Sequence, residues 1–393
     1  MPAFDFTRVA ARERSRAEKY TLRETLFGTE DVLPMWVADM DIETPECVRR
    51  AVAERAQHPV YGYEEMEESA FAAQREWMLR RHGWVMERER LLYSHSVVAS
   101  ISTAIMAFTE PGDEVVVQPP IYPPFVKQVG YNDRRVLSNP LRRDESGRYR
   151  FDLDDLERKI SPRTKLLLLC SPHNPVGRVW EREELEALAA LCLKYGITVF
   201  SDEIHSDLVY APHRHVPFAS LSPDVQAATV TAIGPGKTFN VAGLAISTVA
   251  ISDGTLYRRF EKVYRAIHFA QGTVFGHVGF EAAYREGEAW LEALLGHLRT
   301  NRDRLERLLQ RFEGIAMHPP EGTYLAWLDC RGLGFESDRA LREFFVREAR
   351  LGLSPGISFG REGSGFMRLN FAVPTPLMDE AMRRLEQALK GRR

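Results

Sequence analysis

The sequence predicts an α/β protein: a large domain with a mainly parallel, doubly wound sheet, followed by a smaller α+β domain. Short apolar runs of strand length recur between residues 114 and 233, and amphipathic segments of helical length separate them. This alternation is typical of a parallel sheet covered by helices on both faces. After about residue 275 the character changes, and a long, charge-rich helical stretch leads into the second unit. The 393 residues are enough for two domains.

Helices are expected where capping residues flank amphipathic runs. One opens at Thr44-Pro45-Glu46, with threonine as the cap and proline at the first helical position. Gly83 and Gly196 would close two others, because glycine readily adopts the left-handed conformation that ends a helix. Beyond the helix that opens at residue 46, the expected helices cover about 64–82, 96–109, 182–195 and 288–312.

The expected strands are shorter apolar runs at residues 114–118, 166–169, 197–200 and 228–233. The shift in character near residue 285 predicts a domain boundary there. Three parts follow from these patterns. They are an N-terminal arm over residues 1–45 that packs with the small domain, a large domain over 46–285, and a small C-terminal domain over 286–393.

The composition argues against several classes of protein. Lys and Arg total 52 against 55 Asp and Glu, a formal charge of −3, so nothing favours nucleic acid or an anionic membrane as a partner. No apolar run approaches the ~20 residues of a membrane helix, and the N-terminus lacks the apolar core of a signal peptide. The four cysteines are scattered without a Cys-x-x-Cys pair, which fits the reducing cytoplasm. His213 and His215 have metal-like spacing but no third ligand nearby, so no metal site is expected.

Polar side chains follow three of the expected strands at their carboxyl ends. Asn174 comes after the first, Asp202 and His205 come after the second, and Lys237 comes after the third. Ligands of α/β sheets gather at this edge. We therefore expect these side chains to converge on one site.

These residue types match the needs of pyridoxal 5′-phosphate (PLP). A carboxylate such as Asp202 can keep the ring nitrogen protonated, so that the ring accepts electrons from a carbanion. An amide such as Asn174 can donate to the ring oxygen O3′ and favour its ionised form. A buried lysine such as Lys237 has a lowered pKa, and its neutral amine can bond to the aldehyde and later act as a base. The helix that opens at Ser96 offers unpaired N–H groups to the phosphate.

Seven segments along almost the whole chain match known motifs. They are Ala38–Asp41 (ADMD), Tyr61–Tyr63 (YGY), Ser171–Gly177 (SPHNPVG), Ser201–His205 (SDEIH), Lys237–Asn240 (KTFN), Tyr324–Asp329 (YLAWLD) and Arg368–Asn370 (RLN). In this order they resemble the fold-type I PLP enzymes of the aspartate aminotransferase superfamily. The subgroup they resemble most is the MalY/PatB-type cystathionine β-lyases. Its best marker is His205, where transaminating relatives usually have tyrosine.

The resemblance implies a role for each matching residue around the cofactor. Lys237 would carry PLP covalently, Asp202 would pair with the ring nitrogen, and Asn174 would donate to O3′. Tyr122 would stack on the open face of the ring. The remaining cofactor-binding residues would be Ile204 beneath the ring, His205 near O3′, and the backbone groups of Val97 and Val98 at the phosphate.

The resemblance also implies a substrate clamp and a partner subunit. Arg368 would hold the α-carboxylate of an amino-acid substrate through a bidentate pair, with Tyr122 beside it. Tyr61 would reach the phosphate of the neighbouring subunit, so a homodimer with shared active sites is expected. Lys237, Tyr122 and Asp202 would be the catalytic residues.

Two positions depart from the pattern. Relatives often have serines in the turn before the lysine, where this chain has Gly234 and Gly236. Phosphate binding would then depend on backbone N–H groups, on Thr238 or on the partner's tyrosine. His95 replaces a small residue that is common before the phosphate-binding helix.

The function implied is α,β-elimination, in which cystathionine or another cysteine-type substrate yields a thiol, pyruvate and ammonia. An aminotransferase on the same scaffold is the first alternative, since it shares every cofactor residue. A PLP-binding regulatory protein that acts by protein contact is the second.

Overall fold

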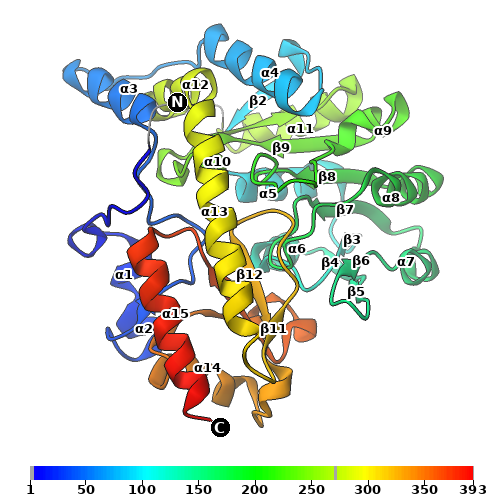
Figure 1. Ribbon diagram of the computed structural model, residues 1–393. Coiled ribbons are helices and arrows are strands. Elements are labelled where there is room, and N and C mark those ends of the chain that lie inside the picture. Colours follow the sequence, from blue (N-terminus) through cyan, green and yellow to red (C-terminus); the bar gives the residue numbers. More distant parts are fainter. Residues whose placement is uncertain (1–3, 270–271, 393) are drawn as a thin grey trace.

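The computed structural model describes residues 4–269 and 272–392, and it has the α/β architecture expected from the sequence. Within these residues the large sheet has seven strands: β2 (Leu91–Ser94), β3 (Glu114–Val117), β4 (Arg135–Ser138), β7 (Thr164–Cys170), β8 (Thr198–Asp202), β9 (Thr229–Ile233) and β10 (Ser247–Ala250). Their order is β2-β10-β9-β8-β7-β3-β4 (Figure 1). Neighbouring strands are parallel except that β10 runs antiparallel to β2 and β9.

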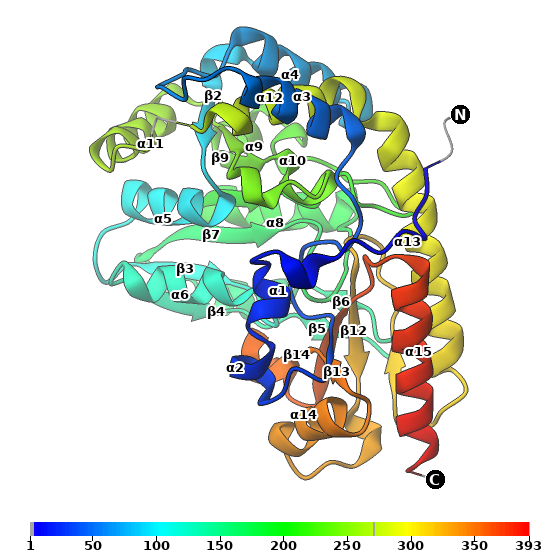
Figure 2. The ribbon, with the colours of Figure 1, turned by 90° about the vertical axis from the view of Figure 1, so that its left-hand side faces the viewer.

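Alternate side chains of the large sheet enter two separate hydrophobic cores, so both faces are covered. Val115 and Val117 pack with the helices of one face. Val116 and Leu167 point the other way and pack with the helices of the opposite face. The first face carries α5 (Val97–Phe108), α6 (Pro123–Tyr131) and α11 (Gly254–Ala266), all visible together in Figure 2. The second carries α7 (Leu153–Lys159), α8 (Arg182–Tyr195) and α9 (Pro223–Ala227).

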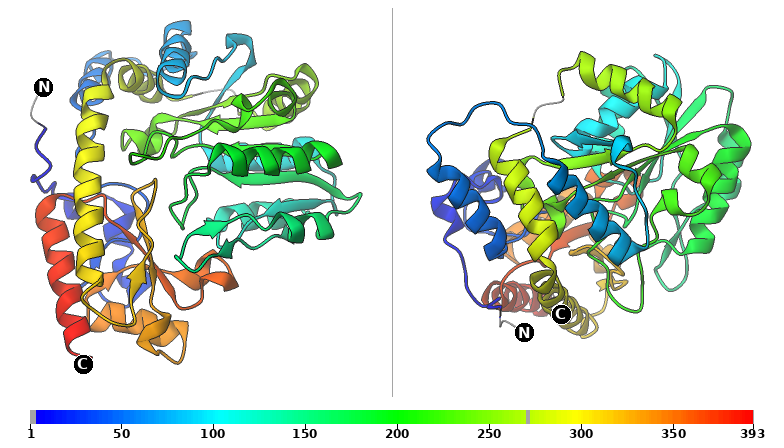
Figure 3. Two further views of the ribbon diagram at one scale, coloured as in Figure 1. Left: turned by 45° about the vertical axis from the view of Figure 1, so that its right-hand side comes forward. Right: turned by 90° about the horizontal axis from the view of Figure 1, so that it is seen from above.

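The long helix α13 (Glu288–Leu309) links the large domain to the C-terminal unit. Before it in the chain, three helices pack together: α3 (Glu46–Gln57), α4 (Glu68–His82) and α12 (Val274–Glu286). From their end α13 runs along both units and packs on α15 (Thr375–Lys390) (Figure 3). One hydrophobic core joins these helices to the C-terminal sheet.

The C-terminal unit contains a small antiparallel sheet of β11 (Ala316–Met317), β12 (Leu325–Asp329), β15 (Phe366–Asn370) and β14 (Ser354–Pro355), with α14 (Asp338–Arg347) beside it. The N-terminal arm carries α1 (Glu18–Thr21), α2 (Arg23–Phe27) and β1 (Leu33–Pro34). In this arm β1 pairs in parallel with β13 (Leu351–Gly352) of the C-terminal unit. The remaining elements are the hairpin β5 (Arg142–Arg143) and β6 (Tyr149–Arg150), and the short α10 (Pro235–Thr238).

Strands β7 and β8 extend beyond the expected ends at 169 and 200, and three helix boundaries also differ from expectation. Helix α4 begins at Glu68 instead of near 64, and Glu64 pairs with Arg55 of α3 instead. Helix α13 ends at Leu309, three residues before the expected end at 312. The N-cap of α3 is Pro45 and not Thr44 as expected, because the Thr44 hydroxyl donates to the carbonyl oxygen of Asn240 instead. In each helix a local signal gave way to a tertiary contact or to fraying of the last turn.

Two general features complete the fold. The four cysteines are buried and free, none of them in a disulfide. Among the helices of residues 4–269 and 272–392, none combines the length and apolar character needed to cross a membrane.

Candidate active site

A cavity of about 190 Å³ lies at the carboxyl ends of β7, β8 and β9. It brings together eight of the ten predicted site residues, from segments that lie far apart in the sequence. They are Val97, Val98, Tyr122, Asn174, Asp202, Ile204, His205 and Lys237. The rest of the lining comes from Ala38, His95, Ser96, Cys170, Gly236, Ala242, Ile246 and Ser247.

Lys237 lies in α10, directly after β9, and its side chain crosses the cavity. Its Nζ donates a hydrogen bond to the carbonyl oxygen of Ala38 at 2.5 Å. Burial lowers the pKa of Lys237 to about 8; the Arg368 charge acts in the same direction, and the carboxylates of Asp39 and Asp202 oppose it. The amine therefore releases its proton far more readily than an exposed lysine does.

Asp202 is the last residue of β8. Within the described part of the chain, its carboxylate accepts one hydrogen bond, from the N–H of Ile204 at 3.1 Å. Burial raises the pKa of Asp202 to about 7, while that hydrogen bond and the charge of Lys237 lower it in part. A buried carboxylate with so little support gains most from a cationic group placed beside it in the cavity.

His205 lies in the turn that follows β8, three residues after Asp202, and it is almost fully buried. Burial lowers the pKa of His205 to about 3, and the charges of Lys237 and Arg368 act in the same direction. The ring is therefore neutral, and it packs edge-on against Tyr324 at a centroid distance of 5.7 Å. Its Nδ1 is buried and has no hydrogen-bond partner among the described residues.

Asn174 and Arg368 join the two sheets at the site. A guanidinium N–H of Arg368, from β15 of the small sheet, donates to Oδ1 of Asn174 at 2.9 Å. Its other terminal nitrogen donates to the carbonyl oxygen of Trp36 at 2.6 Å. Burial lowers the pKa of Arg368 to about 10, and its Nε finds no hydrogen-bond partner among the described residues. The guanidinium is thus charged, buried and able to accept an anionic ligand.

Tyr122 links the first cavity to a second. It precedes α6, and its ring lines both the site around Lys237 and a neighbouring cavity of about 550 Å³. Arg368 lines the second cavity, with apolar side chains such as Phe27 and Phe359. Burial raises the pKa of Tyr122, so its hydroxyl stays protonated. A ligand held by Arg368 therefore has room to extend away from Lys237.

The amino end of α5 forms one wall of the site. The Ser96 side chain caps this helix by accepting from the N–H of Ala99 at 3.2 Å, and Val97 and Val98 line the cavity. A side chain at Gly234 would come within 2.9 Å of the Cα of Ser247, so the close approach of β10 explains a glycine there. Ser247 itself lines the cavity.

Thr238, the other hydroxyl considered for phosphate binding, faces away. It donates to the buried carboxylate of Asp207 at 2.9 Å and is not part of the cavity wall. Asp207 also accepts from the indole of Trp77 at 3.0 Å. Thr238 therefore anchors the lysine-bearing turn to the protein interior, and the expectation that it could bind phosphate is not supported.

Tyr61 is the predicted site residue that lines neither cavity. It is 57% exposed in the connection between α3 and α4. Its hydroxyl donates to the carbonyl oxygen of Ala56 at 2.7 Å, and its ring packs edge-on against Phe275. Val60 and Tyr63 beside it are exposed as well.

Three polar groups in the cavity wall, two side chains and one backbone carbonyl, had no predicted role. His95 is held by the Tyr93 hydroxyl, 2.9 Å from its Nδ1. Ser247 belongs to none of the sequence motifs. The one indication of such a residue was the glycine at 234, because a glycine is needed where another segment comes close to the backbone. The carbonyl of Ala38 is a backbone group, and the only signal for it was the ADMD segment to which Ala38 belongs.

Comparison with known proteins gives a family and several full-length relatives. Residues 30–385 match the family model "Aminotransferase class I and II". The chain is 41% identical to cystathionine beta-lyase PatB of Bacillus subtilis, over 98% of this chain and 100% of the relative. It is 31% identical to protein MalY of Escherichia coli, over 99% of each chain. The crystal structure of cystalysin from Treponema denticola, which contains a pyridoxal 5′-phosphate cofactor, superposes with a TM-score of 0.95 at 31% identity, over 99% of each chain.

Proposed function

The chain belongs to the aminotransferase class I and II family, and we propose that it is a PLP-dependent carbon–sulfur β-lyase. In the net reaction, cystathionine and water give homocysteine, pyruvate and ammonia. The observation that carries this proposal is the convergence of Lys237, Asp202 and Asn174 on one cavity, in a chain that matches cystathionine beta-lyase PatB over its full length. Other cysteine thioethers would react in the same way, because the bond that breaks is the Cβ–S bond.

The residues of the cavity fit PLP. The carboxylate of Asp202 has a raised pKa and no cationic partner in hydrogen-bond contact among the described residues, which suits a protonated ring nitrogen. The free Nδ1 of His205 and the amide of Asn174 suit the ring oxygen. The capped end of α5 offers N–H groups to a phosphate. Ile204, Val97 and Val98 would complete the binding site.

When bound, PLP would supply an aldehyde carbon that exchanges the amine of Lys237 for that of the substrate, and a ring that takes up the electrons left at Cα. Lys237 supplies the base: its amine, with a pKa of about 8, can take the Cα proton onto Nζ at neutral pH. The electron pair of the broken Cα–H bond forms the Cα–Cβ double bond as the thiolate leaves. The enamine product then takes up water and yields pyruvate and ammonia.

Arg368 orients the substrate in this proposal. Its guanidinium already donates to Asn174 and to the carbonyl oxygen of Trp36, and its Nε is free to donate to a carboxylate. A carboxylate held there lies between the two cavities, beside Tyr122. The α-carboxylate of an amino acid would thus be fixed, and its side chain would extend into the second cavity.

We also propose that the enzyme is a homodimer with shared sites. Tyr61 lies outside its own cavity, and the exposed aromatic and apolar side chains of Val60, Tyr61 and Tyr63 form a surface suited to a second copy of the chain. If Tyr61 serves the partner's site, mixing Lys237→Ala and Tyr61→Ala subunits restores activity. The mixed dimer then contains one site with both wild-type residues. Mixtures that stay as inactive as the separate variants contradict shared sites.

The activity is tested with purified, PLP-loaded protein and cystathionine in the absence of any keto acid. Continuous release of pyruvate and free thiol in equal amounts is expected, and Lys237→Ala abolishes it. Lys194→Ala, which removes an exposed lysine paired with Glu157, serves as the matched control and keeps full activity. A single partial turnover that resumes only after a keto acid is added identifies an aminotransferase and refutes the lyase.

A further inference from the structure

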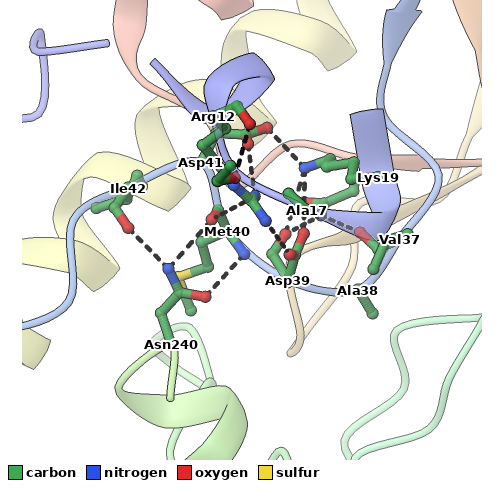
Figure 4. Close-up of polar contacts among 12 residues, drawn as sticks. Arg12, Ala17, Lys19, Val37, Ala38, Asp39, Met40, Asp41, Ile42 and Asn240 are labelled. Carbon is green, nitrogen blue, oxygen red and sulfur yellow. Dashed lines mark hydrogen bonds and ion pairs between the residues drawn. The ribbon is translucent and has the colours of Figure 1, made fainter. Parts of the chain in front are cut away.

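Residues Trp36–Ile42 form an irregular segment without helix or strand, here called the strap; Figure 4 shows residues 37–42 of it. It comes directly after β1 and ends just before α3. Its Ala38 lines the cavity wall. The strap therefore connects the N-terminal arm to α3 and passes beside Lys237.

Side chains from both units hold the strap through its backbone. Asn370 of β15 donates to the carbonyl oxygens of Val37 and Asp39, each at 2.6 Å. Asn240, three residues after Lys237, accepts from the N–H of Met40 at 3.0 Å. The same Asn240 donates to the carbonyl oxygens of Met40 at 3.1 Å and Ile42 at 2.7 Å. Asn240 has a φ of 55°, a left-handed conformation that few residues other than glycine tolerate well.

Two carboxylates of the strap, Asp39 and Asp41, pair with two cations of the N-terminal arm. We call these four residues the clamp: Arg12, Lys19, Asp39 and Asp41 (Figure 4). Arg12 bridges both carboxylates, at 2.5 Å to Asp39 and 2.7 Å to Asp41. Nζ of Lys19 lies 2.7 Å from Asp41 and 3.5 Å from Asp39. Two cations thus neutralise two anions.

Within the clamp, the Lys19–Asp41 pair is too deeply buried to be an ordinary surface ion pair, whereas Arg12 and Asp39 are partly exposed. The side chain of Lys19 is 0% exposed and that of Asp41 is 4% exposed. Buried ion pairs rarely stabilise a fold more than apolar residues of similar size would, because desolvation offsets the attraction. Their best-attested use is to fix one arrangement among several, and here the arrangement they fix is that of the strap.

The clamp acts on Lys237 through one residue. Ala38, next to Asp39, accepts the hydrogen bond from Nζ of Lys237 at 2.5 Å and a second from the Tyr324 hydroxyl at 2.9 Å. The charges that face the amine are those of Asp39, Arg368 and Asp202, and the neutral groups are Tyr324 and His205. Of the two carboxylates, Asp39 is the stronger influence that favours the protonated amine.

We propose that the clamp fixes the strap so that the Ala38 carbonyl, which accepts a hydrogen bond from Nζ of Lys237, holds this amine in place for proton transfer. This rests on the proposed function, because it takes Lys237 as the base. Arg12, Lys19, Asp39 and Asp41 are then positioning residues, since they act through Ala38 and the strap.

The first test follows hydrogen–deuterium exchange in the cofactor-free protein. The amides of Met40 and Asp41 are bonded to Asn240 and Ala372, so they report directly on the strap. In Arg12→Gln they exchange about tenfold faster or more, because the strap opens locally more often. Arg12→Lys, which keeps the charge but cannot bridge both carboxylates, gives a smaller increase.

The matched control is Arg8→Gln on the same arm. Arg8 pairs with Glu43 at 3.2 Å, and its side chain is 69% exposed. Exchange at Met40 and Asp41 is expected to stay at the wild-type rate in this variant. Melting temperatures of all variants are recorded alongside, so that global unfolding is distinguished from opening of the strap.

The second test measures how readily Lys237 is acetylated by acetic anhydride as pH varies, again without cofactor, with the modified peptide followed by mass spectrometry. In Asp39→Asn the midpoint shifts to lower pH, because a carboxylate is lost from the residue next to Ala38, whose carbonyl oxygen accepts from the amine. Asp31→Asn, an exposed carboxylate of the same arm, leaves the midpoint unchanged.

Either of two results overturns the proposal. One is wild-type exchange at the strap in both Arg12 variants, and the other is an unchanged midpoint in Asp39→Asn. An Arg12→Gln variant that does not fold leaves Arg12→Lys and Asp39→Asn to decide the question. Neither readout needs PLP or turnover, so a failure here is distinct from a failure of the lyase assay.

Discussion

Replacing Arg368 by lysine tests the substrate-binding geometry most directly. In the substrate-free structure its two terminal nitrogens are already committed, to Asn174 at 2.9 Å and to the Trp36 carbonyl at 2.6 Å, while Nε is unpaired. Lysine keeps the positive charge but offers a single compact group that cannot reach all three positions. The change therefore removes directional hydrogen bonds and leaves the net charge of the site as it was.

The size of the effect follows from the bonds that are lost. A hydrogen bond to a charged group contributes about 1.5–3 kcal/mol, so the loss of one from a bidentate carboxylate pair lowers kcat/KM by roughly 10- to 150-fold. Arg368→Ala loses both, and the expected decrease is at least about 100-fold. The oxygen of Asn174 also loses its donor, which adds to the cost in both variants.

The assay is steady-state release of pyruvate from cystathionine, with kcat and KM determined separately. Arg331→Lys is the control, since Arg331 pairs with Asp329 near the same small sheet and is 55% exposed. It is expected to have wild-type kinetics. If Arg368→Lys keeps kcat/KM within about threefold of the wild-type value, the carboxylate is bound elsewhere and the proposed orientation of the substrate is wrong.

Three further predictions concern the cofactor-free protein. The rate at which added PLP binds covalently, followed by absorbance, rises about tenfold per pH unit up to about pH 8 and then levels off. The reason is that only the neutral amine of Lys237 attacks the aldehyde. A rate that does not change with pH contradicts this prediction. Gly234→Ser lowers the free energy of unfolding by about 1–3 kcal/mol, because its Cβ would come within 2.9 Å of the Cα of Ser247. Gly296→Ser, with open space around it, is the control and has little effect. Equal melting temperatures of the two variants would contradict the crowding at Gly234. The pKa of Asp202 is raised in the folded state to about 7, so folding binds a proton and stability falls as pH rises from about 4 to 7. Asp202→Asn removes this loss and gains about 2–3 kcal/mol relative to wild type between pH 5 and pH 8 in denaturant titrations. A constant difference between the two pH values would refute it.

The large sheet was predictable because its signals are local. Helix α8 was expected over residues 182–195 and has those bounds, since a capping box opens it and Gly196 closes it in the left-handed conformation. Ser96 caps α5 as expected. Helix α4 was placed too early, because Glu64 has the composition of a helix but is held by Arg55 of another element. The residues next to Glu64 in the sequence do not reveal this contact with another element.

The site was predictable to the extent that its side chains carry the chemistry. Asn174, Asp202 and Lys237 follow successive strands, and parallel strands bring such residues to one edge. The direction of the Thr238 hydroxyl could not be predicted, because it depends on Asp207, a buried partner outside the motif. The contribution of Ala38 is a carbonyl group, which every residue has, so no residue type marks it.

The strap also has a consequence for synthesis on the ribosome. Asn370 holds the carbonyl oxygen of Val37 across 333 residues of sequence, and Arg368 holds that of Trp36 across 332. During synthesis the strap leaves the ribosome early, but its hydrogen-bond partners Asn370 and Arg368 follow only when β15 leaves the exit tunnel. Incomplete chains therefore lack a closed site, and premature termination releases products that can neither seat the substrate nor hold Lys237 for catalysis.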